Sequence, residues 1–147
     1  MRILFLTHYF PPEVNAPASR TFEHCREWAR KGHEVHVVTC VPNHPAGRIY
    51  PGYRNRVLQH EAIAGIHVHR VLTVPAANAG FVGRSLNYFF YLLMAVVTAP
   101  VLPRVDVVVS TSPQFLCGLA GFLVSRLKRV RWVLEIRDLW PESIVTV

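Results

Sequence analysis

The sequence predicts an α/β protein with a doubly wound, Rossmann-like parallel sheet. Short apolar runs rich in β-branched residues alternate with segments of helical length, and turn-forming residues separate them. Apolar residues make up 51% of the 147 residues and charged residues only 17%, which excludes a disordered chain. A chain of this length corresponds to about one domain, so we expect a single Rossmann-like domain over residues 1–147.

The first third of the chain has the pattern of a strand, a helix and a second strand. RILFLT at 2–7 is a continuous apolar run, typical of a strand buried on both faces. Residues 18–32 repeat apolar side chains at helical spacing, with Pro17 in the expected first turn and Gly32 just past the end. EVHVVTC at 34–40 is the second strand, so the unit predicts parallel strands joined by a right-handed crossover.

The next segment predicts a loop and two extended segments. Residues 41–56 hold three prolines and two glycines, which favours a long irregular loop of the kind that serves a site. Two extended segments flank Ala64 and Gly65, and the second alternates inward apolar residues with His67 and His69 directed outward. Because two histidines lack a third ligand, a solvated strand face is favoured over a metal site.

Residues 84–103 are the most apolar stretch of the chain. One asparagine, one threonine and two prolines interrupt or end it, so it is too short and too broken to span a membrane. Two alternatives remain. We favour a helix buried in the core, and the other is an interfacial helix whose aromatic residues and flanking Arg84 and Arg104 rest against a bilayer.

The last third predicts a strand at 106–111, a helix at 115–129 and a strand at 132–136. With the strands at 2–7, 34–40 and 66–74, this gives five strands, for which we expect the order 3-2-1-4-5. The chain then reverses direction beside the first strand, and ligands bind at the carboxyl ends there. The sequence ends without a helix stop signal, so we expect a fragment of a longer protein.

This switch point selects the loops 8–19, 111–114 and 137–143, with 41–56 beside them. Their polar side chains and the starts of the two following helices are the candidate site, since helix starts attract anions. The residues are His8, Glu13, Asn15, Ala16, Ser19, Arg20, Asn43, His44, Thr111, Ser112, Gln114, Glu135, Arg137, Asp138 and Glu142.

Several of these residues also have a structural interpretation. Thr111 or Ser112 serves equally well as a helix cap, and the same holds for Asp138. An ion pair of Arg137 with Glu13 or Glu142 would be structural only. Glu135 stands inside an apolar strand, where a buried carboxylate must be paired or functional.

Charge and cysteine usage narrow the class of partner. The net charge of +7 favours an anionic partner, but the basic residues are scattered and form no nucleic-acid-binding module. Cys25, Cys40 and Cys117 fit no metal or redox spacing and indicate buried thiols in a reducing compartment. The N-terminus has no signal-peptide pattern, so we expect a cytoplasmic protein.

The absence of G-x-G-x-x-G disfavours a dinucleotide-dependent oxidoreductase.

Three stretches in this order resemble a known family: HYFPPEVNAPASR near the start, DVVVSTSPQFLCGLAG, and EIRDLWPES near the end. Together they are similar to the N-terminal domain of family 4 glycosyltransferases with the GT-B fold, particularly the bacterial branch that makes exopolysaccharide and O-antigen sugars. The resemblance implies a retaining transfer from a nucleotide-sugar donor to an acceptor, often a lipid-linked saccharide. It implies no metal and no cofactor, a peripheral place on the inner face of the cytoplasmic membrane, and a second Rossmann domain in cis or trans.

The resemblance also implies roles for individual residues. The loop 11–20 would lie near the donor phosphates, and the loop around Asn43 and His44 would border the acceptor. Arg137 and Asp138 take the place of the family's frequent His-Asp pair beside the reacting sugar, so we expect them to be catalytic. Asn15 and Ala16 stand where the family often has two glycines. Without the second domain, this chain alone is expected to be inactive. The alternative function is that of a non-catalytic binding module or split subunit that docks a donor-binding partner.

Overall fold

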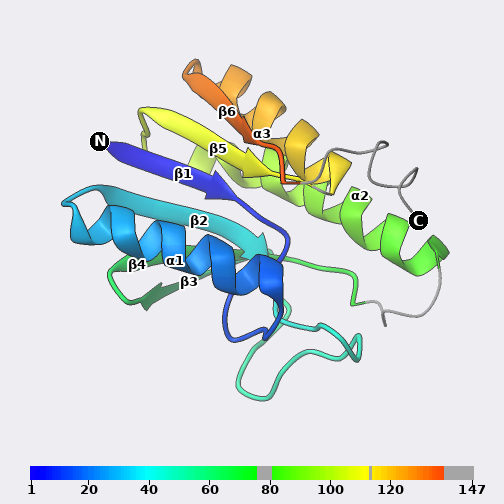
Figure 1. Ribbon diagram of the computed structural model, residues 1–147. Coiled ribbons are helices and arrows are strands. Elements are labelled where there is room, and N and C mark those ends of the chain that lie inside the picture. Colours follow the sequence, from blue (N-terminus) through cyan, green and yellow to red (C-terminus); the bar gives the residue numbers. More distant parts are fainter. Residues whose placement is uncertain (76–80, 113, 138–147) are drawn as a thin grey trace, which may run out of the picture.

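A six-stranded sheet with helices on both faces forms the protein (Figure 1). The structure is a computed structural model that describes residues 1–75, 81–112 and 114–137. The elements in chain order are β1 (Arg2–Leu6), α1 (Ala16–Arg30), β2 (Glu34–Cys40), β3 (Leu58–Ile63), β4 (Ile66–Val71), α2 (Phe81–Thr98), the 3-10 helix η1 (Ala99–Val101), β5 (Val107–Thr111), α3 (Phe115–Lys128) and β6 (Arg131–Glu135).

The strand order is β3-β4-β2-β1-β5-β6. Five strands run parallel, and their order confirms the predicted 3-2-1-4-5 arrangement. The first of the two extended segments is a sixth strand, β3, which pairs antiparallel with β4 at the edge of the sheet. The predicted doubly wound α/β fold is therefore confirmed, and the chain reverses direction on the two sides of β1.

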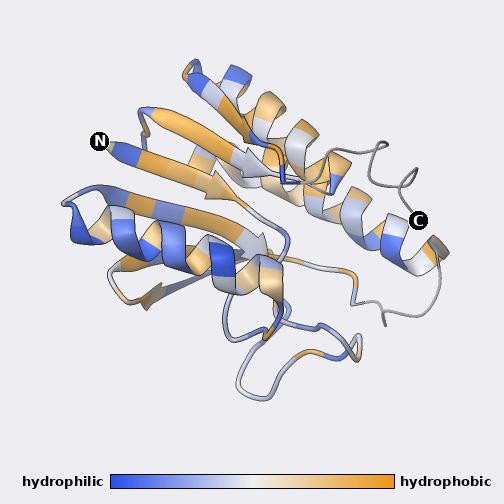
Figure 2. Cartoon of the chain, viewed as in Figure 1, coloured by the Kyte–Doolittle hydropathy of each residue, from blue (hydrophilic) through white to orange (hydrophobic). Residues whose placement is uncertain are grey.

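Alternate residues of the central strands feed two hydrophobic cores. In β1, Ile3 and Phe5 face the core under α1, whereas Leu4 and Leu6 face the core under α2 and α3. Figure 2 shows these strands in the colours of apolar residues almost throughout. Each side chain of this size contributes about 1.5–3 kcal/mol when it is fully buried, which explains why strands covered on both faces carry continuous apolar runs. All three cysteines are buried free thiols, as predicted.

Helix α1 begins and ends at the signals that the sequence contains. The side chain of Asn15 caps it by accepting a hydrogen bond from the Ala18 backbone N–H at 2.9 Å. Pro17 stands in the first turn, where its missing N–H costs nothing. Gly32 follows the end with φ +83°, a conformation that favours glycine.

Two predictions need correction or refinement. His69 does not face solvent. It is 5% exposed, because it lies on the side of β4 that faces the α2 side of the sheet and is covered there. His67, two positions earlier, is exposed. Helix α2 has a side buried in the core, as the favoured alternative expects, and an exposed apolar side, for which contact with a bilayer stays a prediction. Tyr91 on one side is completely buried in the core, and Phe89 on the other side is 56% exposed.

Candidate functional site

The loops that follow the parallel strands lie together at the carboxyl edge of the sheet (Figure 1). They are the segments after β1, β2 and β5 and the two residues after β6 that the structure describes. Because parallel strands end at one edge, this is where the sequence places the candidate site. The long segment 41–57 contains no helix or strand, as predicted.

Glu13 joins the first of these loops to the loop after β2. Its side chain is buried, and its Oε1 atom accepts hydrogen bonds from the backbone N–H of Asn43 at 3.0 Å and of His44 at 2.9 Å. Burial raises the pKa of Glu13, although these hydrogen bonds and the charge of Arg70 act in the opposite direction. The predicted ligand-binding residue therefore clamps two loops from below the surface.

Of the two predicted acceptor-side residues, His44 is the more accessible. Asn43 is buried, and its side-chain amide donates to the Val41 carbonyl at 2.8 Å. His44 is half-buried, with its ring centroid 5.1 Å from that of Tyr9. The Tyr50 hydroxyl donates to the His44 carbonyl at 2.6 Å, which fixes the backbone that presents this imidazole.

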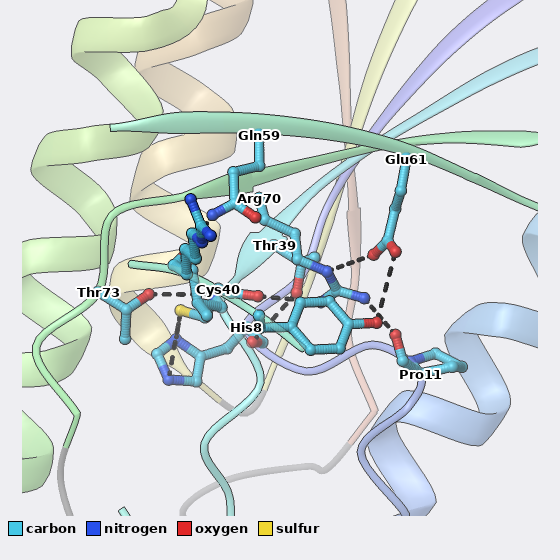
Figure 3. A network of polar contacts seen from close by, with 11 residues as sticks. His8, Pro11, Thr39, Cys40, Gln59, Glu61, Arg70 and Thr73 are labelled. Atoms are coloured by element: carbon cyan, nitrogen blue, oxygen red, sulfur yellow. Dashed lines mark hydrogen bonds and ion pairs between the residues drawn. The ribbon is translucent and has the colours of Figure 1, made fainter. Parts of the chain in front are cut away.

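Arg70 supports both loops from beneath (Figure 3). Its guanidinium pairs with Glu61 and donates to the Pro11 carbonyl and, at 3.1 Å, to the Cys40 carbonyl. The side chain is 1% exposed and also lies over the ring of Tyr53, 5.0 Å from its centroid. Such a buried cation is tolerated because carbonyls and a carboxylate surround it.

Sequence analysis missed Arg70 as a residue of the site. A signal was present, since in a hairpin with a turn at Ala64 and Gly65, Arg70 stands opposite Gln59 and diagonal to Glu61. A cation and a carboxylate at diagonal positions of two neighbouring strands predict an ion pair. The continuation to Pro11 and Cys40 depends on tertiary packing and has no sequence signal.

His8, at the end of β1, is enclosed by aromatic rings. The ring centroids of Tyr88, Tyr9 and Tyr91 lie 4.7, 4.8 and 5.3 Å from that of His8. Burial, and to a lesser degree His44, lowers the pKa of His8 to about 3. His8 is therefore neutral at physiological pH and forms part of the floor of the site.

Arg20 and Glu135 meet above the sheet, from α1 and β6. The guanidinium lies 3.2 Å from the Glu135 carboxylate, and His24 Nδ1 lies 3.7 Å from the same oxygen. The sequence predicts that the Glu135 carboxylate is either paired or functional, and in the structure it is paired. Among the residues that the structure describes, Arg137 forms no ion pair with Glu13.

Ser112 connects the ends of β5 and β6. Its Oγ atom accepts a hydrogen bond from the Arg137 backbone N–H at 2.8 Å, and its own N–H donates to the Glu135 carbonyl at 2.9 Å. Thr111 donates through its hydroxyl to the Ser112 carbonyl at 2.9 Å. Neither residue caps α3, so that alternative is wrong. Gln114 occupies the cap position without a side-chain hydrogen bond to the helix.

Arg137 adds a positive charge after β6, where its backbone is bonded to Ser112 in the segment that leads to α3. Its NH1 atom is buried and has no hydrogen-bond partner among residues 1–75, 81–112 and 114–137. Guanidinium groups bind phosphate and carboxylate oxygens strongly, and the free N–H groups of a helix start attract anions. This edge of the sheet is therefore suited to a negatively charged ligand.

The sequence matches the family model of the glycosyl transferase 4-like domain over residues 15–145. The chain belongs to this family. No curated protein matches the sequence. The match and the fold agree on a Rossmann-like half of a GT-B glycosyltransferase, and the convergent loops are the candidate active site of this glycosyltransferase domain.

The remaining predicted residues of the glycosyltransferase domain have distinct positions. Asn15 uses its side-chain oxygen to cap α1, and its amide nitrogen is buried without a partner in the described part of the chain. Ala16 and Ser19 are exposed in the first turn of α1. Asp138 and Glu142 lie outside the described residues.

Metal binding has no preformed site in the described ranges. The histidine, cysteine, aspartate and glutamate side chains there form no group of three that could hold an ion. The expectation that the enzyme works without a metal or other cofactor stays a prediction.

Proposed function

We propose that this glycosyltransferase domain is the acceptor-side half of a retaining enzyme that moves a sugar from a nucleotide-sugar donor to a lipid-linked saccharide. The observation that carries the proposal is the buried NH1 atom of Arg137, which has no partner among the described residues, on a backbone that is bonded to Ser112 just before the uncapped helix α3. A nucleotide sugar places two phosphates between nucleoside and sugar, and this edge of the sheet offers the matching positive charge. The family match supports the reaction class.

In the proposed reaction, the bond between the anomeric carbon and the donor phosphate breaks, and a bond to an acceptor hydroxyl forms. The hydroxyl passes its proton to an oxygen of the departing nucleoside diphosphate, which leaves with the electron pair of the broken bond. A guanidinium offers donors and no proton acceptor, so Arg137 stabilises this leaving charge and does not act as a base. For Asp138 we propose the role of orienting the reacting sugar or the acceptor hydroxyl.

The loop after β2 is the proposed acceptor border. His44 is a half-buried polar side chain of this loop, and the bonds from Glu13 and Tyr50 fix the backbone on both sides of it. A fixed loop lowers the entropy cost of holding an acceptor in a reactive position. We further propose that a second Rossmann-like domain, in this protein or a partner, holds the nucleotide, and that the reaction belongs to cell-surface polysaccharide synthesis.

The compartment is also part of the proposal. Three free and buried cysteines suit a reducing environment. We therefore place the reaction in the cytoplasm, on the inner face of the cytoplasmic membrane.

The test is transfer of radiolabelled sugar from nucleotide-sugar donors to a membrane lipid fraction, with the complete protein as catalyst. We expect Arg137→Ala to lower the transfer rate about 10²-fold or more, as loss of a charge-stabilising donor does elsewhere. Arg137→Lys should restore part of the rate. Arg131→Ala is the matched control, because Arg131 is exposed at the opposite end of β6.

Equal rates for Arg137→Ala and Arg131→Ala would contradict the role of Arg137. Failure of the unmodified complete protein to transfer sugar from any nucleotide-sugar donor would contradict the proposed function itself. Binding of a donor without transfer would favour the alternative of a non-catalytic module.

A further inference from the structure

One side of α2 and η1 exposes a continuous line of large apolar side chains. Between 45% and 78% of each side chain is exposed, although apolar residues of this size are usually covered. They follow one another at intervals of three or four residues, which places them on a single helix face. We call this set the α2 apolar face: Val82, Leu86, Phe89, Leu93, Val97 and Val101.

The opposite side of α2 is fixed in the protein core. Tyr91 is completely buried, and its hydroxyl donates to the Val38 carbonyl of β2 at 2.9 Å. Ala95 is also completely buried, and Asn87 is 6% exposed. By length and composition the segment Val82–Val101 is long and apolar enough to cross a membrane, so the expectation that it is too short and too broken was wrong. The contacts of its buried side nevertheless hold it against the sheet. The helix is therefore placed to lie on an apolar phase and not to span it.

The two helices on this side of the sheet carry basic residues and no acidic ones. The sequence has no aspartate or glutamate between Glu61 and Asp106, and none between Asp106 and Glu135. Helices α2 and α3, which pack against each other, therefore contain no acidic residue. Their basic residues and the one before β5 are Arg84, Arg104, Arg126, Lys128 and Arg129.

Helix α1, on the other face of the sheet, has a different composition. Two of its arginines pair with glutamates of the same helix, Arg26 with Glu23 and Arg30 with Glu27. Figure 2 shows α1 with alternating polar and apolar colours, whereas α2 is apolar along most of its length. The face that carries α2 and α3 is thus the apolar and cationic one.

We propose that the α2 apolar face, with the cationic residues around it, binds the surface of an anionic lipid bilayer with α2 parallel to the membrane plane. Apolar side chains enter the boundary between headgroups and acyl chains, and arginines remain at the level of the anionic headgroups. A second copy of the chain fits less well, because two such faces would bring like charges together.

The surface leads to the candidate active site. Tyr88 of α2 packs edge-on against His8, with ring centroids 4.7 Å apart, at the carboxyl edge of the sheet. A membrane bound to the α2 apolar face would therefore lie next to the loops of the candidate active site. The docking surface stands on its own observations, and its use to receive a lipid-linked acceptor rests on the proposed function.

The experiment is flotation of the purified protein with vesicles of phosphatidylcholine alone or mixed with phosphatidylglycerol, at low and high salt. We expect flotation with the anionic vesicles, weaker at high salt. The double variant Phe89→Ser and Leu93→Ser should lower the apparent affinity about tenfold or more, since two apolar side chains no longer enter the bilayer. Val57→Ser is the matched control, because Val57 is 58% exposed and lies outside the α2 apolar face.

A second pair of variants tests the charge. Arg126→Glu on α3 should weaken binding to anionic vesicles, whereas Arg30→Glu on α1 should not. Circular dichroism on every variant verifies that the fold is retained, which is expected because the substituted side chains are exposed.

Three results would overturn the proposal: no flotation of the unmodified protein with either vesicle, equal flotation of the double variant, or a dimer in light scattering that the double variant abolishes. Transfer to a soluble saccharide acceptor in detergent separates this test from that of the proposed function. The double variant should retain that activity, so flotation without any transfer would leave the docking surface standing and remove the function.

Discussion

Arg70 and Glu61 form an ion pair between the two strands of the edge hairpin β3–β4, in which the arginine side chain is 1% exposed and the glutamate 30% exposed. The same guanidinium donates to carbonyls in the loops after β1 and β2 (Figure 3). The hairpin β3–β4 therefore supports the candidate active site, which lies at the carboxyl ends of the parallel strands.

Removal of Arg70 should destabilise the protein more than removal of a surface arginine. Arg70→Ala leaves the carbonyls of Pro11 and Cys40 without their donor, and we expect the free energy of unfolding to fall by about 3 kcal/mol or more. Arg70→Lys should lose less. Urea unfolding measures the change, with exposed Arg54→Ala as the control. Equal midpoints for Arg70→Ala and Arg54→Ala would show that the network contributes little to stability.

The fold was predictable because its signals are local. In β1 the continuous apolar run indicated a strand covered on both faces, and Ile3 and Leu4 indeed enter opposite cores. Pro17 and Gly32 marked the two ends of α1. Such signals depend on backbone sterics and on burial, which neighbouring residues determine.

The contacts of the site were less predictable because they join distant segments. Glu135 was correctly expected to be paired or functional, but its partner Arg20 comes from a helix 115 positions earlier in the chain. The burial of His69 depends on what packs over its strand, and the period of two in the sequence does not show which face is covered. Sequence patterns thus identified the loops and missed the bonds between them.

The clamp formed by Glu13 predicts a difference between two substitutions. Glu13→Gln retains a side-chain oxygen for the N–H groups of Asn43 and His44 and removes a buried charge, so we expect little loss of stability. Glu13→Ala leaves two N–H groups unsatisfied and should cost about 2–4 kcal/mol. Hydrogen exchange of the Asn43 and His44 amides should accelerate only in Glu13→Ala. Equal exchange in both variants would mean that the loop is held by other contacts.

Acid should unfold the protein through its buried histidines. Burial and the neighbouring His60, His36, His67 and Lys128 lower the pKa of His69 to about 3, and burial gives His8 a similar value. His36 bonds His69 at 3.0 Å and Glu34 at 2.8 Å. Because the folded-state pKa lies below the unfolded value of about 6.5, the stabilisation is complete above that pH and is lost as the pH falls towards 3.

As the pH falls through this window, His69 and His8 should each lower the free energy of unfolding by up to about 1.4 kcal/mol per pH unit. Urea unfolding between about pH 7 and pH 4.5 measures the slope. His69→Leu should make it shallower, whereas His33→Leu, a half-exposed histidine outside the cluster, should leave it unchanged. An unchanged slope in His69→Leu would assign the acid sensitivity to other groups.

Arg20 is placed either to bind the donor or to hold Glu135, and two variants separate these roles. Its guanidinium is 48% exposed and lies 3.2 Å from the Glu135 carboxylate, so it retains surface for an anion. We expect Arg20→Ala in the complete protein to raise the KM for the nucleotide sugar about tenfold, the loss of one charged contact. Its stability should change by about 1 kcal/mol or less, because the arginine side chain of this pair is about half exposed.

Glu135→Gln provides the decisive comparison. If Arg20 binds the donor, removal of the competing carboxylate should leave the KM unchanged or lower it. If Arg20 only positions Glu135, both variants should impair transfer to the same degree. Arg26→Ala, which breaks the exposed pair with Glu23 on the same helix, controls for the loss of positive charge from α1. A normal KM in Arg20→Ala would remove this arginine from the proposed donor site and leave Arg137 as its cation.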